Sequence, residues 1–261
     1  MELFGLEIKR KLGDEAKAKS FVPPHDDGST IEIGKADGMG GFASTGGVIG
    51  QYIDMGGGVK NEADLVTRYR TMSLVPECDA AIEDIVNEAI SSNDLDAPVS
   101  INLDRVKTFS DSTKEKIRTE FDEVLSLLGF RELSHDIFRK WYVDGRIYFH
   151  KMVDSSNTKK GIQGLRGIDP QKVRKIREIE TKKDEKTNVE VVKAVDEYYL
   201  FNDEGFDKSG NNTGQTVRIS PDAITHVTSG LLDYNQKVVV GYLHKAMKAV
   251  NQLRMLEDAL V

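Results

Sequence analysis

The sequence has a single cysteine, Cys78, among its 261 residues. One thiol forms no intrachain disulfide and excludes zinc sites built from several cysteines, and we expect a reducing intracellular environment. Long apolar runs are also missing, since the three valines at 238–240 are typical of the longest. A helix that spans a bilayer needs about 20 apolar residues, so the sequence predicts no transmembrane helix.

Positive charge is scarce as well. Lys and Arg total 36 against 43 Asp and Glu, which gives a net charge of −7. This balance excludes a protein that coats nucleic acid with broad positive charge, although it permits a local basic patch.

The motifs of common catalytic and cofactor sites are missing too. The sequence contains no G-x-x-x-x-G-K-[ST] phosphate loop and no G-x-S-x-G nucleophile elbow, and its five histidines lack H-E-x-x-H spacing. Residues 38–43 fit a loose G-x-G-x-x-A dinucleotide fingerprint, but the preceding residues 29–34 are a poor core strand and no helix follows at once. We therefore predict no enzyme, no cofactor, no metal ion and no small-molecule ligand.

Glycine is present but unevenly distributed, with ten of the 23 glycines between Gly34 and Gly58. Each glycine raises the entropy cost of ordering, and few large apolar residues offset that cost here. We predict that residues 1–60 form a flexible N-terminal arm. Its tip is an amphipathic segment near helical spacing, which is either a frayed terminus or a docking peptide on a flexible tether. The candidate docking residues are Leu3, Phe4, Ile8 and Leu12.

Helical and strand periodicities follow one another from residue 61 to residue 235, which predicts an α+β domain. Helices are expected over residues 61–70, from Pro76 to about 90, from Ser110 or Ser112 to about 129, and from there to before Gly145. Strands are expected at 98–103, 147–153, 162–168, 217–219 and 223–229, with a β-hairpin that joins 173–180 to 189–201. Residues 138–149 also bring together five aromatic side chains, which we assign to the core.

A last amphipathic helix is predicted from about Gly241 onward, over the region 236–261. Its apolar positions recur every three or four residues: Leu243, Met247, Val250, Leu253, Leu256 and Leu260. No glycine, asparagine or proline stop signal follows them. We therefore expect the chain to be truncated here, and a partner helix to cover this stripe.

Residues 159–193 carry eleven Lys or Arg and six Asp or Glu, a local charge of +5, whereas the rest of the chain is −12. The segment is either a solvated hairpin or a surface for an acidic partner or a phosphate backbone. The candidate contact residues are Lys172, Arg174, Lys175 and Arg177. Aromatic residues are absent from the segment, which argues against base stacking.

Five stretches resemble the portal proteins of contractile-tailed bacteriophages. They are LVTRYRTMSLVPECDAAIEDIVNEAI (65–90), FRKWYVDGRIYFHKMVD (138–154), GLRGIDPQKVRKIREI (164–179), ISPDAITHVTSGLLDYN (219–235) and GYLHKAMKAVNQLRMLEDALV (241–261). The IDP after a strand and the SPDAITH before a long helix are typical of that family. The order and spacing of the five stretches make the resemblance specific over about residues 65–261.

The resemblance implies a structural subunit of a dodecameric ring at one capsid vertex, with a channel for packaging and ejecting double-stranded DNA. The implied partners are further copies of the chain, the major capsid protein, the packaging motor (terminase) and neck or head-completion proteins, in a virion assembled in the host cytoplasm. Residues 61–235 would be a wing domain, and residues 236–261 the start of a helical stem. Two alternatives stay open: a nucleic-acid-processing enzyme subunit that uses residues 159–193, and a helical adaptor.

Overall fold

The computed structural model describes residues 2–3, 6–7, 29–36, 62–91, 98–154, 156–183, 190–206, 216–233 and 238–260. The helices of these ranges are α1 (Glu62–Met72), α2 (Pro76–Ala89), α3 (Asp111–Leu128), α4 (Phe130–Asp144) and α5 (Met247–Leu260). The strands are β1 (Glu2–Leu3), β2 (Leu6–Glu7), β3 (Thr30–Ala36), β4 (Arg146–Val153), β5 (Ile162–Ile168), β6 (Val173–Lys183), β7 (Glu190–Asn202), β8 (Thr216–Ile219) and β9 (Ile224–Thr228). Short 3-10 turns are η1 (Thr158–Lys160), η2 (Pro170–Lys172), η3 (Pro221–Ala223) and η4 (Tyr242–Ala246). The chain is therefore α+β, as the sequence predicts.

The boundaries of the helices follow local chemistry. Pro76 occupies the first turn of α2, where its missing N–H removes no helical hydrogen bond. The Ser110 side chain accepts from the N–H of Thr113 and caps α3, which decides between the two predicted caps. Gly129 and Gly145 end α3 and α4 in left-handed conformations, with φ of 59° and 72°.

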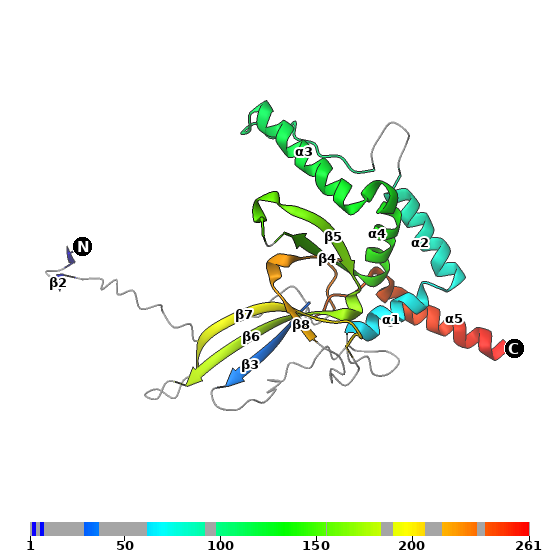
Figure 1. Ribbon diagram of the computed structural model, residues 1–261. Coiled ribbons are helices and arrows are strands. Elements are labelled where there is room, and N and C mark those ends of the chain that lie inside the picture. The colour runs from blue at the N-terminus through cyan, green and yellow to red at the C-terminus, as the bar shows by residue number, and fades with distance from the viewer. Residues whose placement is uncertain are drawn as a thin grey trace.

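The strands form two larger sheets, and in Figure 1 the four-stranded sheet projects away from α2 and α5. One sheet has the order β5-β4-β9 and is antiparallel throughout. The other has the order β3-β6-β7-β8, built on the predicted hairpin of β6 and β7. Its edge strand β3 runs parallel to β6, with Thr30 opposite Lys175.

Three predictions about local structure are wrong. Residues 98–103 form no strand; they run as an irregular segment that is anchored by Leu103, which is 7% exposed. Residues 30–36, assigned to the flexible arm, instead form β3 because β6 supplies a long-range pairing edge. Leu3 lies in a two-residue strand that pairs with Leu6 rather than in a helix. The other candidate docking residues, Phe4, Ile8 and Leu12, lie outside the described residues.

Two apolar clusters make up the core. The larger joins α1, α2 and α4 to the segment that leads into α5: Leu65, Tyr69, Met72, Val75, Ile82, Val86, Val143, Val238, Val240, Leu243 and Val250. The smaller lies between the two sheets: Tyr148, Val173, Tyr199 and Ile224. Of the five aromatic residues assigned to the core, Tyr148 is buried and the other four are half-buried.

Candidate functional site

Helix α1 lies where the helical core, the sheets and the start of α5 meet. Leu65, Val66 and Tyr69 share one helical face, and each is about as buried as a side chain can be, at 1% exposure. This face contacts α4, η4 and α5, while the flank of the helix faces η2. We call the polar contacts that surround α1 the junction.

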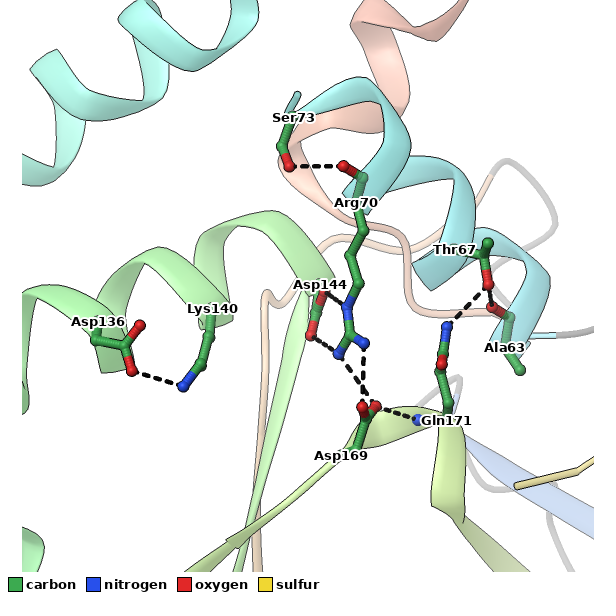
Figure 2. Close-up of polar contacts among 9 residues, drawn as sticks. All are labelled: Ala63, Thr67, Arg70, Ser73, Asp136, Lys140, Asp144, Asp169 and Gln171. Carbon is green, nitrogen blue, oxygen red and sulfur yellow. Dashed lines mark hydrogen bonds and ion pairs between the residues drawn. The ribbon is translucent and has the colours of Figure 1, made fainter. Parts of the chain in front are cut away.

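Arg70 forms the centre of the junction, as Figure 2 shows. Its Nε and one terminal nitrogen donate to the two carboxylate oxygens of Asp144, at 2.9 and 2.7 Å. The guanidinium also donates to both oxygens of Asp169, at 3.1 and 3.0 Å. Planar guanidinium matches carboxylate geometry in this bidentate manner. One side chain of α1 thus holds the end of α4 and the loop between β5 and η2.

Asp169 also begins η2, since its side chain accepts from the N–H of Gln171 at 2.9 Å. The Gln171 side chain donates in turn to the hydroxyl of Thr67 on α1, at 2.8 Å. Pro170 occupies the first position of this 3-10 turn. Asp169 of the IDP sequence therefore both caps η2 and accepts hydrogen bonds from Arg70 (Figure 2).

A second ion pair fixes the other end of α1. Arg146 is 2% exposed, and one of its terminal nitrogens lies 2.7 Å from a carboxylate oxygen of Glu62. Another terminal nitrogen donates to the carbonyl of Val239 at 2.7 Å. The two residues that flank Gly145 in sequence thus contact the two ends of α1.

The third part of the junction involves Tyr69 and the residues before α5. The Tyr69 hydroxyl is hydrogen-bonded to Nδ1 of His244 at 2.9 Å and accepts from the N–H of Gly241 at 3.3 Å. Gly241 also lies against Gly145, where an added Cβ would come within 2.6 Å of the Gly241 Cα. The chain therefore enters α5 through a contact that only glycine permits.

The protonation states reflect this burial. Burial raises the pKa of Tyr69 to about 12, so its hydroxyl stays neutral. Burial also raises the pKa of Asp144, and the hydrogen bonds and charge of Arg70 offset part of that effect. Burial opposes ionisation of Asp169 too, but its hydrogen bonds from Arg70 and Gln171 outweigh it and lower the pKa. The junction thus contains charged groups that depend on one another.

Helix α5 carries its predicted apolar stripe in two parts. Leu243, in η4 just before α5, and Val250 are 7% and 9% exposed and belong to the larger core cluster, and Met247 packs against it. The later positions are increasingly exposed, at 39% for Leu253, 63% for Leu256 and 88% for Leu260. We call these last three residues the apolar ridge. It extends beyond the larger core cluster, and the described residues leave Leu256 and Leu260 largely exposed.

The four predicted basic contact residues all lie at or beside the start of β6. Lys172 pairs with Asp203 at 3.1 Å, and the Arg177 Nε lies 3.6 Å from a Glu197 carboxylate oxygen with only 12% of its side chain exposed. The Arg174 guanidinium lies 4.2 Å from the centre of the Phe206 ring, and burial lowers its pKa. Lys175 lies opposite Thr30 and Tyr199 in the sheet. Lys172, Arg174 and Arg177 thus contact other residues of the chain, and a role in binding an acidic partner stays a prediction.

Sequence reasoning missed the junction. The residues concerned are Glu62, Arg70, Asp144, Arg146 and Asp169. The one local signal is the Asp-Gly-Arg of residues 144–146, where two opposite charges flank a glycine between a helix and a strand. Within the described ranges no group of three or more His, Cys, Asp or Glu side chains is placed to hold a metal ion, and no helix has the length and apolarity to cross a membrane.

Comparison with known proteins gives a consistent result. Residues 62–261 match the family described as Bacteriophage T4-like portal protein (Gp20). The chain is 43% identical over 205 residues to the portal protein of Vibrio phage KVP40, a match that covers 76% of this chain and 39% of the relative. It is 31% identical over 207 residues to the portal protein of Salmonella phage ViI, covering 76% of this chain and 37% of the relative. The chain thus spans about two fifths of the length of these curated relatives. It belongs to the T4-like bacteriophage portal protein family.

Proposed function

We propose that this chain forms part of one subunit of a dodecameric portal ring at a single capsid vertex. Portal proteins are structural components of the phage virion, and we expect no enzymatic activity. The ring surrounds a channel through which double-stranded DNA is packaged and ejected. It provides the platform on which the major capsid protein, the packaging motor (terminase) and the neck proteins meet, after assembly in the host cytoplasm.

The apolar ridge of α5 is the observation that carries the ring proposal. A helix with one continuous apolar face is stable in water only when that face is covered, since each leucine side chain gains about 1.5–3 kcal/mol on burial. The first half of the α5 stripe is covered by the core, and the second half is exposed. A neighbouring subunit or a helix of the same subunit covers it in the proposed ring, where α5 begins the stem.

The charge distribution is consistent with a channel wall rather than a DNA-binding enzyme. A protein that neutralises many phosphates holds DNA tightly, which opposes the sliding that a conduit requires. The net charge is −7, and Arg174 and Arg177 are engaged within the sheet. We therefore favour the ring over a nucleic-acid-processing enzyme subunit or a helical adaptor.

The test is the assembly state of the full-length protein. We expect native mass spectrometry and negative-stain electron microscopy to give a closed ring of twelve copies. Replacing Leu256 and Leu260 by glutamine should shift the population toward smaller species, while Met255→Gln, 72% exposed on another face of the same helix, is the matched control. A full-length protein that stays monomeric at high concentration would refute the proposal.

The N-terminal residues have a separate role in this proposal, namely attachment of the ring to the capsid shell through Leu3, Phe4, Ile8 and Leu12. Because β3 begins at Thr30 and pairs with β6, deletion of residues 1–28 removes those candidates and keeps the sheet. We expect this deletion to leave rings intact and to lower their incorporation into heads. Normal incorporation would exclude the attachment role.

A further inference from the structure

Helix α2 presents an acidic face that is opposite its buried side. All five charged residues of α2 are acidic. Ile82 and Val86 are 1% and 0% exposed and define the inner side. Residues advance by about 100° along a helix, so Glu77, Asp84 and Glu88 lie within about 40° of one another on the outer side. All three are exposed.

The remaining two acids of α2 are already paired. Asp79 forms an ion pair with Arg139 of α4, and Glu83 lies 2.7 Å from another nitrogen of the same guanidinium. No described basic residue forms an ion pair with Glu77, Asp84 or Glu88. We call these three the acidic face. It extends over twelve residues, from Glu77 to Glu88, which is about 16 Å of helix.

The opposite charge gathers along the β4–β5 hairpin, with two lysines in the turn η1 and Arg166 further along β5, opposite His150. Residues 150–166 contain four basic residues and one acid, Asp154. Lys159, Lys160 and Arg166 are exposed, and only Lys160 lies near that acid, at 3.7 Å. The turn η1 holds the two lysines side by side in sequence at the end of the hairpin. We call these three residues the basic end.

The two surfaces lie on different sides of the molecule. Figure 1 shows α4 between α2 and the sheet of β4 and β5. Helix α4 packs on α2 and continues through Gly145 into β4, so their spacing within one subunit is fixed. An acidic and a basic surface on opposite sides cannot satisfy each other in one copy. They match between successive copies in a head-to-tail arrangement, which forms a ring when the rotation between copies closes.

We propose that the acidic face of α2 receives the basic end of the β4–β5 hairpin of the next copy. The inference rests on the proposed ring and specifies which surfaces meet around it. A two-fold arrangement would set like charges against each other at the same face, which electrostatic complementarity disfavours. Exposed ion pairs are screened over about 8 Å at physiological ionic strength, so this contact is salt-sensitive.

The experiment uses two charge-reversed forms of the full-length protein. One carries Glu77→Lys, Asp84→Lys and Glu88→Lys, and the other carries Lys159→Glu, Lys160→Glu and Arg166→Glu. Each form alone should fail to form rings in sedimentation at moderate salt, because like charges face each other at every contact. An equimolar mixture should recover rings with alternating copies, since each altered surface then meets its complement.

The matched control reverses three acids of α3, with Glu120→Lys, Asp122→Lys and Glu123→Lys. These residues are exposed, and the change in net charge equals that of the α2 form. The control should assemble as the wild type does, with circular dichroism confirming the fold of all forms. Rings from either reversed form alone, failure of the α3 control, or no recovery on mixing would each overturn the inference.

Two further outcomes separate this inference from the proposed function. Wild-type protein that forms no ring refutes the ring itself, whereas wild-type rings with fully competent reversed forms refute only the pairing of surfaces. Loss of salt-dependent DNA binding in the basic-end form, with its rings intact, would assign the basic end to phosphates instead and overturn the inference.

Discussion

Replacing Arg70 by methionine should lower the free energy of unfolding, because it removes the centre of the junction. Methionine keeps much of the volume of the side chain and removes the five guanidinium donors. Asp144, with a side chain 5% exposed, then retains a buried carboxylate without its arginine. Removing one partner of a buried pair costs about 3–5 kcal/mol. Because the Arg70 side chain is 39% exposed, solvent screens part of the interaction, and we expect a loss of about 2 kcal/mol.

The measurement is the free energy of unfolding in urea. The single tryptophan, Trp141, lies on α4 one turn before Asp144, and its indole N–H donates to the Thr228 carbonyl at 3.3 Å. Its fluorescence therefore reports directly on the end of α4. Lys140→Met is the matched control, because Lys140 pairs with Asp136 on the exposed side of the same helix (Figure 2). Such a surface pair contributes less than about 0.5 kcal/mol.

The pH dependence of the Arg70→Met deficit has a defined sign. Burial raises the pKa of Asp144, and the loss of Arg70 removes the opposing effect, so the pKa of this carboxyl rises further. A group whose pKa is raised by folding contributes stability below its unfolded pKa and loses it as the pH rises through the folded value. The deficit should therefore shrink as the pH falls from 7 toward about 5. A variant within about 0.5 kcal/mol of the wild type at pH 7, or a deficit that grows on acidification, would refute this reasoning.

The other predictions concern the close contacts around the junction and α5. Gly145→Ala should lower the free energy of unfolding by at least about 3 kcal/mol, because φ is 72° and the added Cβ would collide with Gly241. Gly230→Ala, with φ of 73° but open space around its Cβ, should cost only about 1 kcal/mol in the same urea titration. Tyr69→Phe should cost about 1–2 kcal/mol by urea unfolding, since it removes a buried hydroxyl with two partners. Leu256→Gln should lower the thermal midpoint by no more than about 2 °C, since Leu256 is 63% exposed. Val250→Ala should lower the midpoint further because Val250 is buried, and equal midpoints for the two variants would contradict the prediction.

The helices were predictable because their signals are local. Pro76, Ser110 and the two glycines at 129 and 145 act within one turn of the boundary that each defines. The β6–β7 hairpin was predictable for a similar reason, since only six residues separate the two strands in sequence. Strand β3 was missed because its partner is more than 130 residues further along the chain, and a glycine-rich neighbourhood masks its short alternating pattern.

The junction was unpredictable for the same physical reason. Arg70 is separated by 74 residues from Asp144 and by 99 from Asp169. No periodicity in the sequence connects an arginine on one helix with an acid at the end of another. The motif IDP was nevertheless part of the family resemblance, and the structure supplies its cause: Asp169 caps η2 and binds Arg70 at the same time.

The junction also determines where the apolar ridge points. Tyr69 is hydrogen-bonded to Gly241 and His244, which precede α5 in the chain. Val250 of α5 belongs to the same core cluster as Tyr69. Because a helix is stiff over a few turns, fixing its first turns fixes the direction of its exposed end. Changes at Arg70 or Gly145 should therefore alter assembly through α5 without altering the apolar ridge, the acidic face or the basic end. In the proposed ring, which repeats identical contacts, a small angular error at α5 recurs in every subunit, so the geometry around Arg70 bears on whether the ring closes at all.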